Sequence, residues 1–243
     1  MFHIFNKNEY LVDHLEGFVD IHNHILPKID DGAKDVNESV ELIKAFGEFG
    51  IRDFICTPHI MSNYYDNTPK TIKKSYKKLK KELEKLAISD ITLNYAAEHM
   101  IDANFETVLG RGEILPLNGQ FLLIEMSYLQ PSINFDVAVE KILKNGFFPI
   151  LAHPERYHYF KNHSFYKSEG LSYQLNLLSL GIYYGKGVQK RAFKLLAEGL
   201  IDFLGSDVHN TTQLKALMEI RINIKILQFL RPLLARTNHT FES

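Results

Sequence analysis

The sequence contains one cysteine, Cys56, among 243 residues. A single thiol cannot form an intramolecular disulfide or a thiolate metal cluster, and a chain without disulfides suits a reducing compartment. We therefore expect a cytoplasmic protein. Thiol-based tyrosine phosphatases need an arginine six positions after the reactive cysteine, but Ser62 stands at that position. Cys56 is thus expected to be a buried strand residue, and thiol-based phosphate chemistry is excluded.

The sequence also lacks an excess of charge of one sign, and it has no long apolar run. The formal net charge is −1, which argues against broad attraction to nucleic acid or anionic lipid. No apolar run approaches the ~20 residues that a membrane-spanning helix needs, and the first residues lack the apolar core of a signal peptide. We expect neither a nucleic-acid partner nor insertion into a membrane.

Two common catalytic motifs are missing. Residues 181–186 read GIYYGK, one residue short of the P-loop spacing, and Gly187 follows where a serine or threonine is required. No G-x-S-x-G segment occurs, so a serine hydrolase built on a nucleophile elbow is not supported. Nucleotide binding has no support either.

Short apolar runs alternate with helical patterns, which predicts one α/β domain with parallel strands. We expect strands at 18–22, 54–59, 91–98, 121–125, 148–153, 173–176 and 203–207. We expect helices at 36–46, 68–86, 136–145, 188–198 and 214–230. Residues 1–16 are expected to be a peripheral N-terminal extension, 17–243 the main domain, and the chain after Pro232 a fraying tail.

The expected helix at 68–86 is strongly basic. Its sequence PKTIKKSYKKLKKELEK keeps an apolar stripe that includes Ile72, Leu79 and Leu83 at helical spacing. Such a pattern favours a solvated outer helix over a docking face for phosphate or an acidic peptide.

Residue types that bind metal ions recur at the ends of the expected strands. His22 and His24 are two residues apart in an extended segment, so both imidazoles face the same side. The ends of the other apolar runs carry, in chain order, His59, Glu98, Glu125, His153, and Asp207 together with His209. A parallel barrel gathers strand ends on one face, where these side chains would meet. Nitrogen and oxygen ligands in this number indicate a cluster of two or three divalent ions.

Each of these residues also has a purely structural interpretation. A histidine can cap a carbonyl, Glu98 or Glu125 can pair with a lysine, and Asp207 can cap a helix. The recurrence of ligand types on six runs favours the metal hypothesis. Asp31, in LPKIDDGAK, would add a carboxylate, although Asp-Asp-Gly is also an ordinary turn sequence.

Further residues near these strand ends suggest a phosphate substrate. Arg156 follows His153 by three residues and would grip phosphate oxygens through two parallel hydrogen bonds, or else pair with Glu155. Tyr64 and Tyr65 follow His59 and would either flank an aromatic substrate or pack a loop. Because bridged ions clamp the attacking and leaving oxygens of an in-line displacement, phosphoester hydrolysis fits this set.

Six segments together resemble a known family: DIHNHILPKIDDGAK, CTPH, AAEHMID, LLIEM, LAHPERY and GSDVHN. They are similar to the polymerase and histidinol phosphatase (PHP) superfamily and, within it, to the CpsB/CapC-type bacterial protein-tyrosine phosphatases of capsule and exopolysaccharide loci. The match runs from about Gly17 to Asn210. It implies a distorted, seven-stranded, TIM-like barrel with three divalent ions, manganese favoured and iron, cobalt or zinc possible. The implied substrate is phosphotyrosine on the tail of a bacterial tyrosine kinase.

The resemblance also implies roles for individual residues. His22, His24, Glu98 and Asp207 would hold the first ion, Glu98 would bridge to a second held by Glu125 and His153, and Asp31, His59 and His209 would hold the third. Arg156 would bind phosphate, and the catalytic residues would be Arg156, Asp207 and His209. Relatives often carry an Arg-Pro after the last motif, whereas this chain has Leu214 and Lys215 near that place. Lys215 could substitute as a point charge without bidentate geometry.

The hypothesis for the reaction is attack of a metal-bound hydroxide on phosphorus, without a covalent phosphoenzyme. A phenolate leaving group, with a conjugate-acid pKa of about 10, makes a dedicated general acid less necessary. The alternatives are a histidinol phosphate phosphatase with the same ions and a catalytically silent scaffold that binds the kinase. A barrel amidohydrolase shares the His-x-His motif, but Arg156 and the Asp207-x-His209 pair favour phosphate.

Overall fold

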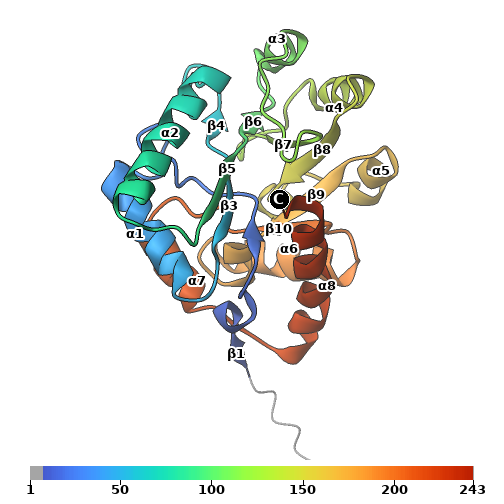
Figure 1. The fold of residues 1–243 in the computed structure, drawn as a ribbon. Coiled ribbons are helices and arrows are strands. Elements are labelled where there is room, and N and C mark those ends of the chain that lie inside the picture. Colours follow the sequence, from blue (N-terminus) through green and yellow to red (C-terminus); the bar gives the residue numbers. More distant parts are fainter. Residues whose placement is uncertain (1–7, 243) are drawn as a thin grey trace, which may run out of the picture.

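The computed structural model describes residues 8–242 as a mixed α/β fold with helices around the outside of the strands (Figure 1). The strands are β1 (Glu9–Tyr10), β2 (Val19–Asp20), β3 (Asp53–Cys56), β4 (His59–Ile60), β5 (Thr92–Tyr95), β6 (Glu98–Met100), β7 (Phe121–Glu125), β8 (Phe148–Ala152), β9 (Ser172–Asn176), β10 (Phe203–Gly205) and β11 (Arg221–Ile222). The helices are α1 (Val36–Gly47), α2 (Pro69–Lys85), α3 (Phe105–Gly110), α4 (Phe135–Lys144), α5 (His163–Ser168), α6 (Lys186–Ala197), α7 (Thr211–Met218) and α8 (Ile224–Phe241). None of the described helices has the length and apolar character needed to cross a bilayer.

All seven expected strands occur, but two of them are interrupted. The run at 54–59 divides at Thr57 and Pro58 into β3 and β4, and the run at 91–98 divides into β5 and β6. Because proline cannot donate to a strand ladder, Pro58 is a natural break. β3 pairs with both β2 and β5, whereas β4 and β6 continue the sheet β10-β9-β8-β7-β6-β4.

The distorted seven-stranded barrel implied by the resemblance is not confirmed. The parallel strands of residues 8–242 form a six-stranded and a three-stranded sheet, and neither closes on itself. A single parallel bridge between Asn23 and Val208 joins the segments that follow β2 and β10. An interior apolar cluster that includes Ile21, Leu123 and Ile150 lies between the strands. It is closed at one end by α8, because the ring of Phe241 contacts those of Phe121 and Phe203.

The predicted helix at 214–230 is wrong, because this stretch forms α7, β11 and α8. Alternating Ile220 and Ile222 suit a strand, and β11 pairs antiparallel with β1, with Tyr10 opposite Arg221. The side chain of Asn223 then caps α8 by accepting the backbone N–H of Ile226. A partner strand distant in sequence therefore overrides the local helical spacing.

Both ends of the described chain pack against the domain. A 3-10 helix, Leu11–His14, follows β1, and Leu11 and Leu15 are fully buried. Residues 1–7, part of the predicted extension, lie outside the described residues. The expected fraying after Pro232 is wrong for residues 233–241, because α8 continues through them and buries Thr237 and Phe241.

Candidate metal centre

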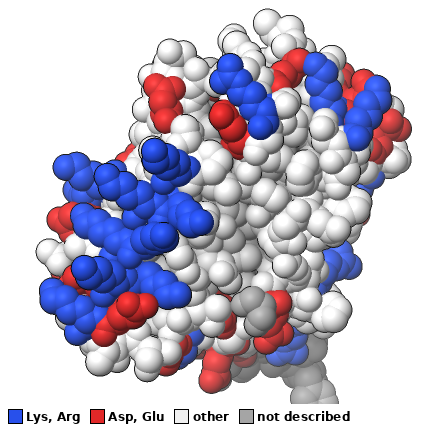
Figure 2. All heavy atoms as spheres, turned by 45° about the horizontal axis from the view of Figure 1, so that its top comes forward, with Lys and Arg blue, Asp and Glu red and all other residues white. Residues whose placement is uncertain are grey.

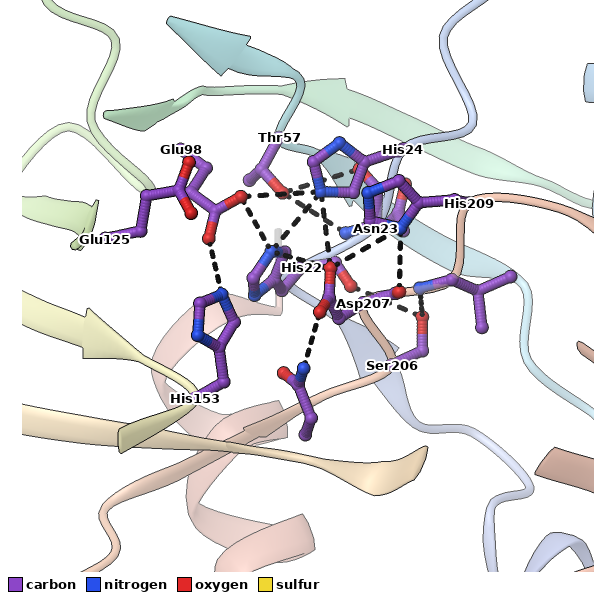
Figure 3. Close-up of polar contacts among 12 residues, drawn as sticks. His22, Asn23, His24, Thr57, Glu98, Glu125, His153, Ser206, Asp207 and His209 are labelled. Atoms are coloured by element: carbon purple, nitrogen blue, oxygen red, sulfur yellow. Dashed lines mark hydrogen bonds and ion pairs between the residues drawn. The ribbon is translucent and has the colours of Figure 1, made fainter. Parts of the chain in front are cut away.

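The predicted ligand residues meet at the ends of the parallel strands. Figure 3 shows seven of the nine, without Asp31 and His59. Strand register places them side by side, since His59 pairs with Glu98 and Met100 with Glu125 across neighbouring strands. Four overlapping groups have ligand atoms within 4.8 Å of one another. These groups are His24, Asp31, His59 and His209; His22, His24 and Glu98; His22, His153 and Asp207; and His59, Glu98 and Glu125.

His22, His24, Glu98 and Asp207 form the buried centre of the cluster. The Nε2 atom of His22 lies 3.3 Å from both Glu98 Oε2 and Asp207 Oδ1. His24 Nε2 lies 3.5 Å from Glu98 Oε2 and 3.4 Å from Asp207 Oδ1. Each of the four residues is at most 1% exposed. Two imidazoles and two carboxylates thus point at one small volume.

The other predicted ligands extend this centre on two sides. His153 Nε2 lies 3.0 Å from Glu98 Oε1, and His59 Nδ1 lies 2.8 Å from Glu125 Oε1. Asp31 Oδ1 lies 3.4 Å from His59 Nε2 and 3.6 Å from His209 Nε2. His209 stacks on His24 with ring centroids 3.8 Å apart. The structure therefore brings all nine predicted ligands together.

Several buried atoms in this cluster make no hydrogen bond within residues 8–242. They are Glu98 Oε2, Glu125 Oε1, and the Nδ1 atoms of His59 and His153. His59 Nδ1 lies within 3.0 Å of both carboxylate oxygens, yet the arrangement lacks hydrogen-bond geometry. Buried polar atoms are otherwise almost always paired, and an exception can mark the place of an ion. The donor set therefore fits divalent cations.

Charge within the cluster shifts the ionisation of its members. Burial alone would lower the pKa of His22, but the carboxylates of Glu98 and Asp207 raise it. Burial would raise the pKa of Glu98, yet His22 and His59 hold it well below its ordinary value. The carboxylates and the His22 imidazole thus favour one another's charged forms. A divalent ion would take over that role and displace the protons.

Two of the predicted ligands occupy left-handed backbone conformations. His153 has φ 36°, and Asp207 has φ 53°. Positive φ is uncommon outside glycine, although Asp, Asn and His tolerate it best. Such conformations persist where surrounding structure holds them, often at functional sites. In each case the turn follows the end of a strand, β8 or β10, and directs the side chain toward the cluster.

Polar residues that the sequence interpretation missed orient the ligands. His24 Nδ1 donates to Asp30 Oδ2 at 2.8 Å, and His22 Nδ1 donates to Gln174 Oε1 at 2.7 Å. Gln174 Nε2 donates to Asn176 Oδ1, whose amide nitrogen donates to Asp207 Oδ2 at 2.5 Å. Because each Nδ1 donates, each Nε2 is left as the ligand atom. The sequence signal for Gln174 and Asn176 is that two polar residues stand two apart in β9, so both face the same side of the sheet.

Gly205 must be a glycine for these ligands to keep their places. A Cβ at this position would lie 2.7 Å from the Cβ of His22 and 2.9 Å from Gln174 Nε2. Contacts below 3.0 Å force one of the partners to move. The last residue of β10 therefore lacks a side chain because His22 and its orienting amide pack directly against it.

The cluster lies at the base of a pocket of about 890 Å³. Its lining includes Asp31, His59, Glu125, Asp207 and His209, together with Arg156, Tyr64, Tyr65, Tyr128 and Tyr184. The ring of Tyr65 stacks on His59 with centroids 5.4 Å apart. Lys215 is exposed and does not line the pocket, whereas Asn210 and Gln213 do. The suggestion that Lys215 contacts phosphate is therefore not supported.

Arg156 is held at the wall of this pocket by three neighbours. Its Nη1 donates to Asp207 Oδ2 at 2.9 Å. The guanidinium lies 4.1 Å from the ring centroid of Tyr128 and 4.2 Å from that of Tyr184. Stacking between the two aromatic rings fixes the plane of the guanidinium and leaves its other N–H groups available to donate hydrogen bonds. The alternative pairing with Glu155 does not occur among the ion pairs of the described residues.

The chain is similar to bacterial phosphatases. A model of the family described as "Capsular polysaccharide synthesis, CpsB/CapC" matches residues 18–224. The tyrosine-protein phosphatase YwqE of Bacillus subtilis (strain 168) is 32% identical over 199 residues, which are 79% of this chain and 77% of the relative. The putative tyrosine-protein phosphatase CapC of Staphylococcus aureus is 30% identical over 206 residues, which are 80% of this chain and 78% of the relative.

Solved structures support the same relationship. One, from work on YwqE of Bacillus subtilis and CpsB of Streptococcus pneumoniae as metal-dependent tyrosine phosphatases, has a TM-score of 0.74 at 30% identity and covers 81% of both chains. A phosphotriesterase homology protein from Escherichia coli shares the fold alone, with a TM-score of 0.51 at 11% identity over 89% of this chain and 92% of that one. On the family match and the similarity to YwqE, this chain belongs to the CpsB/CapC family.

Proposed function

We propose that this protein is a metal-dependent phosphatase that hydrolyses phosphotyrosine in proteins. The observation that carries the proposal is the convergence of nine histidine and carboxylate ligands, with Arg156 beside them, at the base of one pocket. The relatives named tyrosine-protein phosphatases support the substrate class. The family description supports a role in capsular polysaccharide synthesis. The phosphoprotein would be a bacterial tyrosine kinase of such a system, as the resemblance implies.

We further propose three divalent ions, manganese favoured, held as the resemblance implies. Hard and borderline nitrogen and oxygen donors suit manganese, and also iron, cobalt or zinc. Such ions would activate the attacking water and draw charge from the phosphoryl oxygens. The geometry supports shared ligands, because Glu98 belongs to two of the candidate groups and His22 and His24 belong to two each.

The chain's own residues would bind and orient the phosphoryl group. Arg156 presents a fixed fork whose remaining N–H groups can donate to phosphate oxygens. Asp207 would both ligate an ion and orient Arg156, since its Oδ2 accepts from the guanidinium. His209 lines the pocket and donates from Nδ1 to the carbonyl of Asp207, which leaves Nε2 toward Asp31. Tyr64 and Tyr65 would flank the aromatic ring of the substrate.

The decisive experiment combines metal analysis with activity. The purified protein would be stripped with a chelator, manganese titrated back, and turnover measured on a phosphotyrosyl peptide and on histidinol phosphate. We expect loss of activity on stripping, recovery with about three ions per chain, and preference for the peptide. Preference for histidinol phosphate would favour a small-molecule phosphatase. A metal-replete protein inert toward both substrates would favour a regulatory scaffold.

Replacing Cys56 with serine should leave metal-dependent turnover nearly unchanged. Cys56 is fully buried in β3, and burial raises the pKa of its thiol well above the ordinary value, which disfavours the nucleophilic thiolate. The buried hydroxyl would lower stability by on the order of 1 kcal/mol. The measurement is kcat on an aryl phosphate at saturating manganese, with thermal unfolding as the check on folding. Inactivity with normal metal content would contradict the metal mechanism.

Replacing Gln174 with alanine should weaken metal binding more than it slows the reaction. The substitution removes the acceptor of His22 Nδ1 and the donor to Asn176. Loss of such an orienting partner typically costs 10- to 100-fold in metal affinity or activity. Manganese affinity would be measured by calorimetry, with Gln120→Ala, an exposed residue just before β7, as the control. Unchanged affinity would show that the amide does not orient the ligand.

A further inference from the structure

One surface of the protein is strongly basic, and it belongs to α2. This helix carries eight lysines and two glutamates, while the whole chain has a formal net charge of −1. Its inner side buries Ile72, Leu79 and Leu83, so the lysines occupy the outer side. All eight are exposed: Lys70, Lys73, Lys74, Lys77, Lys78, Lys80, Lys81 and Lys85. Figure 2 shows a nearly unbroken area of basic side chains at the left of the molecule.

The lysines of α2 contribute little to the stability of the fold. Within residues 8–242, Lys85 is the one lysine of α2 that pairs with a carboxylate, Glu82 at 3.0 Å. Like charges recur one turn apart, as at Lys73, Lys77 and Lys81, and each such pair destabilises a helix by a few tenths of a kcal/mol. The basic side chains at the upper right of Figure 2, by contrast, lie among acidic ones. Binding of an anionic ligand would neutralise these lysines and relieve the repulsion that destabilises α2.

The stripe begins beside the pocket. Met61, Ser62, Tyr64 and Tyr65 line the pocket, and α2 starts at Pro69. The turn between them is firm, because Thr68 and Thr71 form a reciprocal capping box. The chain therefore passes from the pocket lining at Tyr65 to the first lysine of α2, Lys70, within five residues.

The shape of the stripe favours a narrow ligand. α1 packs beside α2 and carries Glu38, Glu41, Lys44 and, at its C-terminal cap, Glu48, of which Glu41, Lys44 and Glu48 are exposed. An anionic membrane is broad enough to meet those glutamates as well, and no apolar face of α2 is free to insert, because that face is buried in the core. An extended peptide can follow α2 alone. Seventeen helical residues span about 25 Å, the length of about eight extended residues.

We propose that the lysine face of α2 binds an acidic segment of the protein substrate that adjoins the phosphotyrosine. The sequence pattern alone favoured a solvated face. What points to a ligand is the exposure of the lysines, seven of which have no carboxylate partner within residues 8–242, on a helix that starts four residues after Tyr65 of the pocket lining. This inference rests on the proposed function. The substrate would then be recognised at two places. The phosphotyrosine would enter the pocket, and the aspartates and glutamates of the adjoining segment would bind along α2.

The test compares two phosphotyrosyl peptides that differ only in an eight-residue flank of glutamate or of glutamine. At low ionic strength we expect kcat/KM to be at least tenfold higher for the acidic peptide, and the preference to vanish at about 0.5 M salt. The triple variant Lys73→Gln, Lys77→Gln, Lys81→Gln should remove most of this preference. Glutamine has a helix propensity similar to lysine, so α2 should stay folded, as circular dichroism would check.

The matched control is Lys186→Gln, Lys190→Gln, Lys194→Gln on α6. These lysines have the same spacing and are also exposed. The control should keep the preference, and both triple variants should hydrolyse para-nitrophenyl phosphate at the unaltered rate. Equal rates on the two peptides, or equal losses in both variants, would overturn the proposal.

Two further measurements distinguish a membrane from a peptide and surface binding from catalysis. Vesicles of phosphatidylserine and phosphatidylcholine should not sediment the protein at about 0.15 M salt, and sedimentation that needs the α2 lysines would overturn the peptide assignment in favour of a membrane. Binding of an unphosphorylated, fluorescent eight-glutamate peptide, read by anisotropy, reports on the surface without catalysis. If turnover fails on every substrate but this peptide binds through α2, the proposed function fails and the surface stands.

Discussion

Asp207→Ala should reduce phosphatase turnover by on the order of 10³-fold or more. Asp207 Oδ1 lies among the Nε2 atoms of His22 and His24, and its Oδ2 accepts from Arg156 and Asn176. Its loss would remove an ion ligand and release the arginine together. Metal-ion catalysis supplies several kcal/mol of charge stabilisation, and each 1.36 kcal/mol is tenfold in rate. The measurement is kcat/KM on an aryl phosphate with manganese saturating.

Asp90→Ala provides the control for this substitution. Asp90 is an exposed aspartate whose partner is Arg52 at the surface, and surface pairs contribute little to stability. Its removal should leave turnover within a factor of about two of the original. If Asp207→Ala kept a tenth of the activity with the full complement of metal, the cluster would not be the catalytic centre.

Arg156→Ala should lower kcat/KM by about 10²- to 10³-fold, the range for removing one donor to a developing oxyanion. Arg156→Lys should recover only part of the loss, because an ammonium lacks the planar fork that Tyr128 and Tyr184 hold between their rings. Competitive inhibition by inorganic phosphate should weaken in parallel, which reports binding of the phosphoryl group directly.

Arg52→Ala is the corresponding control, because Arg52 is a partly exposed surface arginine. Metal content must be measured in every variant, since Arg156 also contacts the proposed ligand Asp207. An Arg156→Ala protein that loses its ions, and regains full turnover at high manganese, would show that the arginine positions Asp207 and does not bind phosphate.

The sequence predicts the site better than it predicts the sheet. Ligand types at strand ends are readable because parallel strands bring their ends to one face, whatever the exact curvature. His59 and Glu98, both expected on this face, lie opposite each other, although each begins a separate short strand after a break. A closed barrel would need regular strand pairing between the segments that follow β2 and β10. These segments are joined by a single bridge, between Asn23 and Val208. No local pattern specifies that pairing.

The local sequence does not single out the site residues that the prediction missed. Asp30 is indistinguishable from Asp31 in the turn sequence, yet only Asp30 is buried against His24, while Asp31 faces the pocket. Tyr128 and Tyr184 lie far apart in the chain and acquire meaning only when Arg156 is placed between them. The helix predicted over 214–230 failed for the same reason, because its partner strand β1 lies far away, near the start of the chain.

The left-handed conformations of Asp207 and His153 lower the stability of the fold while they place two side chains in the cluster. A non-glycine residue held at positive φ costs about 1 kcal/mol or more. Glycine at either position would relax the backbone and remove a buried ionisable group. The fold tolerates this backbone cost, and as a result a carboxylate and an imidazole are directed into the cluster.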